Sequence, residues 1–336
     1  MKIHKEEDKR IQKYMYKGNK IVRQPYLKEG DKVALISPAY WVPQEVITGA
    51  ADTIREWGLQ PVIGPHTNKQ NMNAYAGTEE ERTADLLWAL EDDSIKAIIC
   101  SRGGYGSMHL LSRLPQSCFL EHPKWLIGHG DITILLHALI CNGVIGIHGP
   151  MGFQMTGDHE QATDITRDML FGSIPQYEIH HNPYDHCGHA EGILVGGNLS
   201  SYSAITGTCF QLPPKQDVIL FIEETEEPLH NIDRLFYRLR LQPDFERVRG
   251  IIFGSFNSIR FDLQSDSVEQ MLTAHLAEYD IPVCCGFPVG GNSCFPMMVG
   301  APCVLDVSPE KSVLTFNVDG ERKTYTLESE VQQLFK

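Results

Sequence analysis

The sequence lacks long hydrophobic runs and an excess of positive charge. No stretch of about 18 apolar residues occurs, so no membrane-spanning helix is expected. The formal net charge is −14, which disfavours nucleic acids and anionic membranes as partners, because both bind basic patches. The charged N-terminus, which includes Lys2, Lys5 and Asp8, is not followed by an apolar segment. We therefore expect no signal peptide and predict a cytoplasmic location.

The cysteine pattern also indicates neither a disulfide framework nor a zinc site. The nine cysteines are scattered, and several lie inside apolar runs such as Ala97–Cys100 and Val283–Cys285. This is typical of reduced, buried thiols. Histidines, Asp185 and Cys187 are concentrated between residues 180 and 189, but their spacing matches no zinc motif. We favour a polar linker over a metal site there and expect no metal or other cofactor.

The chain does contain an alternation of short apolar runs and amphipathic segments. Hydrophobic residues make up 42% and charged residues 21%, as is typical of a soluble globular protein. Apolar runs that predict strands lie at 32–37, 60–63, 97–100, 125–127 and 144–148, and helical spacing lies at 44–57 and 78–90. This alternation predicts an α/β fold with a doubly wound, mostly parallel sheet and helices on both faces.

The second half of the chain predicts another domain of the α/β or α+β type. Apolar runs at 192–197, 218–223, 248–253 and 283–286 predict its strands. The chain is long enough for two domains of ordinary size. We predict a polar N-terminal extension at 1–25, a first domain at 26–171, a linker at 172–190 and a second domain at 191–336.

Glycine-rich and polar residues follow the predicted strands, where ligands bind in parallel sheets. Ser101–Ser107 (SRGGYGS) follows one strand, and its glycines allow backbone N–H groups to approach an anion or an oxyanion. The alternative is an ordinary tight turn. Gly128–Thr133 (GHGDIT) follows the next strand, in the context of a nucleophile elbow. The projecting position there is Gly130, which has no side chain, and Asp131 fits a helix cap.

Two further strand ends carry candidate residues. Glu223 ends an apolar run, which is a usual position for a catalytic carboxylate. The acidic residues that follow, up to Glu227, are equally typical of a solvated acidic face. Gly286–Asn292 (GFPVGGN) follows the last predicted strand and reads on its own as a loop.

In their order along the chain, these motifs resemble the LD-carboxypeptidase family, which includes murein tetrapeptide carboxypeptidases and microcin C self-immunity peptidases. The resemblance extends from about Leu27 to about Asp306. It rests on seven short segments in family order: Gly30–Ala39, Ser101–Gly106, Ile127–Thr133, His148–Met151, Gly196–Ser200, Phe221–Arg234 and Gly286–Asn292.

The resemblance implies a two-domain homodimer with the active site in a cleft between the domains. Members of the family cleave the peptide bond between an L- and a D-centre and release D-alanine from murein peptides, using a Ser-His-Glu triad. The serine position falls on Gly130, the glutamate on Glu223 and the histidine on Gly291. Two of the three triad residues are therefore replaced by glycine.

The remaining elements of the implied site do not depend on these two side chains. The resemblance places the oxyanion donors at the backbone N–H groups of Gly104 and Asp131, and Arg102 in the same loop is a candidate for substrate binding. Without nucleophile and base, a triad enzyme retains only a residual rate from the oxyanion hole and substrate binding. We expect a hydrolytically impaired protein that still binds a peptide or muropeptide-like ligand.

Two alternatives stay open on the sequence alone. One is an active serine-type carboxypeptidase with a rearranged catalytic centre, and the other is a non-catalytic interaction protein. Candidate substitutes near the implied site are Ser101, Ser107, His129, His148, Ser293 and Cys294. For His129 we expect a side chain that points away from the site, because the neighbour of an elbow residue usually does.

Overall fold

The computed structural model describes residues 21–22, 24–71, 73–115, 117–211, 216–263, 265 and 267–329. Most of the predicted extension, residues 1–20 and 23, lies outside this part. The end of the extension is not a polar tail. Gln24 is buried, and its side-chain amide donates hydrogen bonds to the carbonyls of Lys124 and Ile145 at 2.8 and 2.6 Å. The first domain therefore begins at or before this residue.

The first sheet has the strand order β11-β5-β4-β3-β1-β2, and its first five strands along the chain are parallel. Its strands are β1 (Lys32–Ile36), β2 (Gln60–Ile63), β3 (Ile95–Cys100), β4 (Trp125–Gly128), β5 (Gly146–His148) and β11 (Met297–Val299). The helices between them are α2 (Gln44–Glu56), α3 (Glu79–Glu91), α4 (Ser107–Leu111), α5 (Cys118–Glu121) and α6 (Thr133–Cys141). β3 and β4 are buried almost throughout, because helices cover both faces of the sheet.

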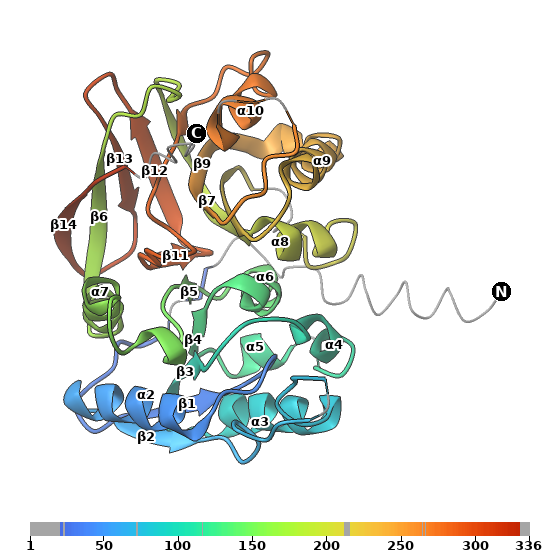
Figure 1. Cartoon of the computed structure of the whole chain (residues 1–336). Coiled ribbons are helices and arrows are strands. Elements are labelled where there is room, and N and C mark those ends of the chain that lie inside the picture. Colours follow the sequence, from blue (N-terminus) through green and yellow to red (C-terminus); the bar gives the residue numbers. More distant parts are fainter. Residues whose placement is uncertain are drawn as a thin grey trace.

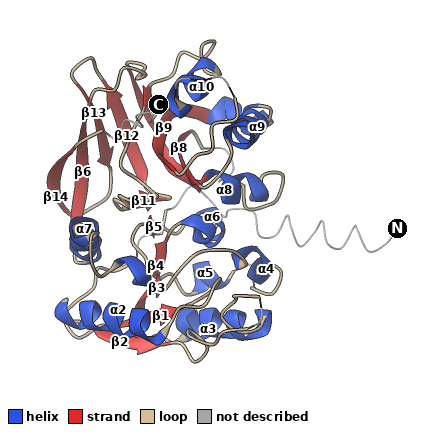
Figure 2. Cartoon of the chain, in the orientation of Figure 1, coloured by secondary structure: helices blue, strands red, loops and turns tan. Residues whose placement is uncertain are grey.

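The second sheet has the order β10-β9-β8-β7-β12-β13-β6-β14, with β7 to β10 parallel and β12 and β13 antiparallel to their neighbours. Its strands are β6 (Ser173–His180), β7 (Gly188–Asn198), β8 (Val218–Thr225), β9 (Val248–Asn257), β10 (Val283–Cys284), β12 (Pro302–Val307), β13 (Lys311–Phe316) and β14 (Glu321–Leu327). The helices of this half are α7 (Glu160–Leu170), α8 (Leu199–Ile205), α9 (Leu229–Arg240) and α10 (Val268–Ala274). The predicted two-domain α/β architecture is confirmed (Figures 1 and 2).

Strand β6 lies inside the segment 172–190, which the sequence predicts as a linker. It pairs with β13 and β14 in the second sheet. Ile174, Tyr177 and Ile179 are buried. These apolar residues are separated by polar ones, and the prolines and histidines around them conceal the strand pattern in the sequence.

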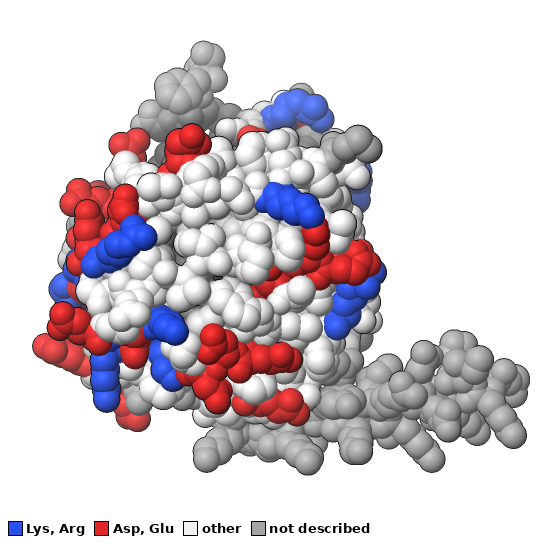
Figure 3. Space-filling model, turned by 90° about the horizontal axis from the view of Figure 1, so that it is seen from below, with Lys and Arg blue, Asp and Glu red and all other residues white. Residues whose placement is uncertain are grey.

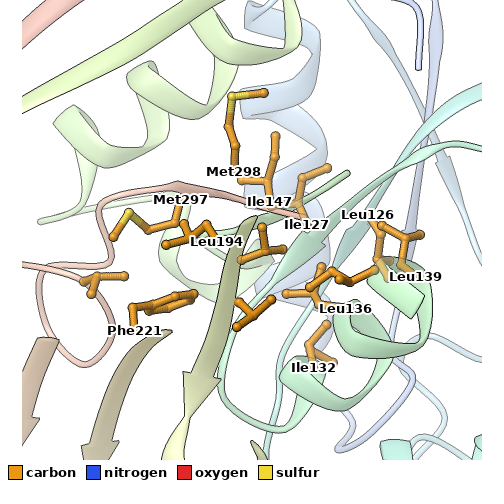
Figure 4. Packing of buried hydrophobic residues seen from close by; sticks show 14 of the residues in the cluster. Leu126, Ile127, Ile132, Leu136, Leu139, Ile147, Leu194, Phe221, Met297 and Met298 are labelled. Atoms are coloured by element: carbon orange, nitrogen blue, oxygen red, sulfur yellow. The ribbon is translucent and has the colours of Figure 1, made fainter. Parts of the chain in front are cut away.

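β11 joins the two halves of the molecule. It follows the strands β7 to β10 of the second sheet in the chain, yet it pairs antiparallel with β5 of the first sheet. Met297 and Met298 pack in a buried cluster that includes Ile147 of β5, Leu194 of β7 and Phe221 of β8 (Figure 4). His148, which ends β5, lies 3.7 Å from Glu223 near the end of β8, so the carboxyl ends of these strands meet at the junction of the domains (Figure 2).

The described surface carries interspersed charges. On the face seen from below, Lys and Arg side chains lie among Asp and Glu around an area of uncharged residues (Figure 3). Across the described segments, no helix has the length and apolar character needed to cross a membrane.

Candidate functional site

The turn after β4 has the backbone of a nucleophile elbow. Gly130 begins the short 3-10 helix η1 (Gly130–Ile132) with a φ of +60°, and α6 follows directly. Apart from its chain neighbours, no described atom lies within 4 Å of a Cβ built at Gly130. The position has room for a side chain, although an L-residue with this φ would carry strain of about 1–2 kcal/mol.

The glycine-rich loop after β3 lies against this turn. A Cβ at Gly103 would be 3.2 Å from the carbonyl oxygen of His129 and 3.3 Å from the backbone nitrogen of Asp131. The Asp131 carboxylate accepts a hydrogen bond of 2.8 Å from the Ser107 N–H, at the start of α4. Burial raises the pKa of Asp131, and the hydrogen bonds from the Ser107 and Gly106 backbones oppose this shift. The two loops are thus held together by a hydrogen bond and by close backbone packing.

The predicted binding groups are Arg102 and the backbone N–H groups of Gly104 and Asp131. Gly104 has a φ of +107°, and the ring of Tyr40 packs so closely on it that a Cβ would be only 2.4 Å from the ring. In the described part of the chain, the N–H groups of Gly104 and Asp131 donate to no other group. Arg102 is exposed, and its guanidinium lies 5.9 Å from the centre of the Tyr40 ring. Their roles in binding stay predictions.

Glu223 lies near the carboxyl end of β8 and is only 1% exposed. Burial raises its pKa to about 7, and the nearby His129 opposes this shift. Its Oε1 lies 3.7 Å from Nε2 of His148 and accepts no hydrogen bond from the described residues. Burial lowers the pKa of His148 to about 3, so this contact is not an ion pair at neutral pH.

The acidic run is therefore not a uniformly solvated face. Glu224 is 2% exposed and accepts hydrogen bonds from the side-chain amide of Asn198 and the N–H of Ser200 at 2.6 and 2.8 Å. Burial, followed by the neighbouring Glu223, raises the pKa of Glu224 to about 7. Glu226 is exposed, as a solvated acidic face would be.

Gly291, the predicted position of the base, is approached by a side chain from the end of another strand. Gly291 has a φ of +53°, and a Cβ there would be 1.7 Å from Oδ1 of Asn257, at the end of β9. This oxygen accepts a hydrogen bond of 3.1 Å from the N–H of Asn292. The Asn257 carboxamide thus occupies the space in which a histidine side chain would begin.

His129 does not point away from the site. Its ring lies 5.7 Å from the ring of His148, and Nε2 is 2.6 Å from Oε1 of Gln154. Nε2 also lies 3.6 Å from Sγ of Cys294, which accepts a 2.7 Å hydrogen bond from Nε2 of Gln154. Gln154 ends the 3-10 helix η2 (Gly152–Gln154), and Cys294 follows Gly291 by three residues, so the contact crosses the domain junction.

The other proposed substitutes have different surroundings. Ser101 is buried, and its hydroxyl shares a hydrogen bond with the hydroxyl of Ser37. Ser107 is also buried, and neither serine hydrogen-bonds to an imidazole of the described chain. Within the described segments, no group of three or more His, Cys, Asp or Glu side chains could hold a metal ion.

Sequence reasoning missed Gln154 and Asn257 altogether. Neither lies in a motif, and each reaches the site only because the fold brings its element there. The sequence did indicate the positions of the elbow, Glu223 and the loop 286–292. Each of them directly follows an apolar run or belongs to one.

The fold and the site together define a two-domain α/β protein with an elbow-type turn at the domain junction. The comparison with known proteins gives the family. Residues 33–149 match the LD-carboxypeptidase N-terminal domain and residues 191–305 match the LD-carboxypeptidase C-terminal domain. The chain belongs to the LD-carboxypeptidase family.

Individual relatives agree with this assignment. A putative carboxypeptidase of Synechocystis sp. is 33% identical over 83% of this chain and 93% of its own length. A probable murein peptide carboxypeptidase of Bacillus subtilis is 31% identical over 89% of this chain and 96% of its own length. The crystal structure of a muramoyltetrapeptide carboxypeptidase from Oxalobacter formigenes superposes with a TM-score of 0.78 at 24% identity, covering 86% and 99% of the two chains.

Proposed function

We propose that this protein binds a peptide or muropeptide-like ligand at the domain junction and has lost hydrolysis by a Ser-His-Glu triad. The proposal rests on the surroundings of the two glycines that stand at the predicted nucleophile and base positions. Gly130 offers no nucleophilic side chain, and the side-chain space at Gly291 is closed by Asn257. The binding groups of the loop 101–107 do not depend on either position.

The ligand is proposed to bind through Arg102 and the backbone N–H groups of Gly104 and Asp131. An arginine guanidinium recognises a carboxylate through charge-assisted hydrogen bonds. The glycine-rich loop allows a carbonyl oxygen to approach the two N–H donors closely. A peptide with a free C-terminal carboxylate supplies both kinds of group. We further propose that the protein acts in the cytoplasm as a homodimer, as the family resemblance implies.

Calorimetry with a tetrapeptide that ends in an L-centre followed by D-alanine tests the proposal. The wild type is expected to bind, and Arg102→Ala is expected to bind about tenfold more weakly, since hydrogen bonds to charged groups contribute about 1.5–3 kcal/mol. The matched control is Arg55→Ala on the exposed side of α2, which should bind like the wild type.

Two results would contradict the proposal. One is the absence of binding by the wild type. The other is rapid release of D-alanine through an acyl-enzyme that hydroxylamine traps, because this would require a side-chain nucleophile.

A further inference from the structure

Four aromatic side chains form a cluster beside the predicted binding groups. The ring centres of Tyr40 and Tyr75 lie 5.8 Å apart, those of Tyr75 and Tyr105 6.2 Å apart, and those of Tyr105 and His109 5.3 Å apart. Tyr40 follows β1, Tyr75 precedes α3, and Tyr105 and His109 belong to the turn after β3 and to α4. Tyr40 and Tyr75 also pair in an isolated β-bridge, which holds their backbones together. We call these four side chains the aromatic shelf.

The aromatic shelf is continuous with the glycine-rich loop. A Cβ at Gly104 would overlap the ring of Tyr40, and a Cβ at Gly106 would lie 3.0 Å from the ring of Tyr75. These two rings therefore pack directly on the loop backbone, and Tyr105 is itself part of the loop. A peptide whose carbonyl oxygen reaches the N–H of Gly104 lies next to the ring of Tyr40.

The aromatic shelf is open to a ligand. Tyr105 is 50% exposed, and Tyr40, Tyr75 and His109 are partly buried. Within the described chain, the hydroxyls of the three tyrosines form no hydrogen bond, and none of these oxygens is sealed from solvent. A tyrosine that is buried for structural reasons usually pairs its hydroxyl, whereas aromatic rings with free polar tips are typical of binding surfaces.

Two of the rings already carry a cation, which disfavours a cationic ligand. The Arg82 guanidinium lies 4.8 Å from the centre of the Tyr75 ring, and that of Arg102 lies 5.9 Å from the centre of the Tyr40 ring. Another cation at these rings would be repelled by the two guanidinium groups. An aliphatic ligand would make no use of the free hydroxyls. The aromatic shelf therefore fits a neutral ring whose edge carries polar groups.

The angles between the rings favour a sugar over a flat heterocycle. The rings of Tyr40 and Tyr75 are inclined by 62°, those of Tyr75 and Tyr105 by 40°, and those of Tyr105 and His109 by 86°. A flat base stacks between parallel rings, and these three pairs offer no parallel arrangement. A pyranose is not flat, so its C–H groups can contact rings of different inclination while its hydroxyl and amide groups reach the tyrosine hydroxyls.

From this geometry we propose that the aromatic shelf binds the sugar ring of a sugar–peptide, whose peptide part runs from the N–H of Gly104 along the shelf. The inference rests on the proposed binding of a peptide at the loop 101–107. A sugar on the N-terminus of a tetrapeptide lies about 10 Å before the last peptide bond in an extended chain. Tyr105, the most exposed ring of the aromatic shelf, is the residue that determines the preference for the sugar.

Calorimetry tests the inference with two ligands. One is the tetrapeptide that ends in an L-centre followed by D-alanine, and the other is the same tetrapeptide carrying N-acetylmuramic acid on its N-terminus. The wild type is expected to bind the sugar–peptide about tenfold more tightly, which corresponds to about 1.4 kcal/mol and is within the range of an aromatic contact. Tyr105→Ala is expected to reduce this preference to less than about twofold.

A second variant covers the case in which Tyr105→Ala does not fold. Tyr105→Phe keeps the ring and removes only the hydroxyl, so it is expected to retain a preference of about threefold for the sugar–peptide. The matched control is Tyr237→Ala on α9, which should keep the full preference. Tyr237 is 45% exposed, and its ring lies 5.5 Å from that of His275, an arrangement like that of Tyr105 and His109.

Saturation-transfer NMR gives a direct readout of the contact. The C–H protons of the sugar ring should receive saturation from the wild type and from Tyr237→Ala, but not from Tyr105→Ala.

Four results would overturn the inference. Equal affinity of the wild type for the two ligands would do so and leave the proposed function standing. A preference that survives Tyr105→Ala would show that the sugar binds elsewhere. Displacement of the sugar–peptide by adenosine more readily than by N-acetylmuramic acid would assign the aromatic shelf to a flat base. Absence of binding by both peptide ligands would overturn the inference together with the proposed function.

Discussion

At the scale of single residues, the glycines at the two predicted triad positions, Gly130 and Gly291, differ in what a side chain would meet. Gly130→Ser is expected to lower the free energy of unfolding by only about 1–2 kcal/mol, the cost of its positive φ. Gly291→His is expected to cost about 1–3 kcal/mol more than this, because besides a similar positive φ its Cβ would overlap Oδ1 of Asn257. Denaturant titration of both variants measures the difference.

The double variant Gly291→His with Asn257→Gly is the matched control for this comparison. Removing the carboxamide should restore a large part of the lost stability, because the overlap disappears. Equal losses for Gly130→Ser and Gly291→His would show that Asn257 does not close the base position.

The buried environment of Glu223 can be tested through the pH dependence of the free energy of unfolding. Its pKa is about 7 in the folded protein and about 4.3 in an unfolded chain. Between about pH 4.3 and pH 7 the folded state binds more protons than the unfolded state. The contribution of Glu223 to the free energy of unfolding therefore falls as the pH rises through this range. Glu223→Gln should therefore raise the free energy of unfolding by about 3 kcal/mol at pH 8, at about 1.36 kcal/mol per pKa unit, and have little effect at pH 4.

Thermal or denaturant unfolding at the two pH values checks this prediction. The exposed Glu278 provides the control, since Glu278→Gln should change stability little at either pH. A destabilising effect of Glu223→Gln at pH 8 would show that the charged carboxylate is stabilised in the folded protein.

The places of the candidate residues in the fold could be predicted from the sequence only where they depend on local position. The elbow and Glu223 are found because a strand end fixes where its next residues lie. The ring direction of His129 could not be found, because it is set by Gln154, 25 residues further along the chain. The closure of Gly291 depends on a contact with another strand, which no local pattern reveals.

At the scale of elements, patterning predicted most of the strands and helices of the first domain. Apolar runs correspond to β1, β3 and β4, which are buried on both faces and read as continuous hydrophobic segments. β6 was missed because its buried residues alternate with polar ones in a segment rich in histidine and proline. The pairing of β11 with β5 was also not predictable, since three residues carry no periodicity.

At the scale of the whole molecule, the two domains are expected to unfold together. The reason is that β11 lies in the sequence of the second domain but forms an edge strand of the first domain's sheet. The four tryptophans, Trp41, Trp57, Trp88 and Trp125, all lie in the first domain, so their fluorescence reports on it alone. Far-ultraviolet circular dichroism reports on both domains. The two signals should give coincident denaturation curves.

Separate transitions in the two signals would contradict this coupling. Met298→Pro supplies a comparison, because proline cannot donate a hydrogen bond and Met298 pairs with Ile147. This variant is expected to separate the two curves or to lower both midpoints.

The placement of β11 also sets an order of events during synthesis. Among the described residues, Met297–Val299 pair with the outer edge of β5, so the first sheet stays incomplete until those residues have left the ribosome. Until then the nascent chain presents an unpaired strand edge, the kind of surface that pairs with other chains. A nascent chain that stalls between the two domains therefore carries an exposed, aggregation-prone edge at the place where the finished protein has its domain junction.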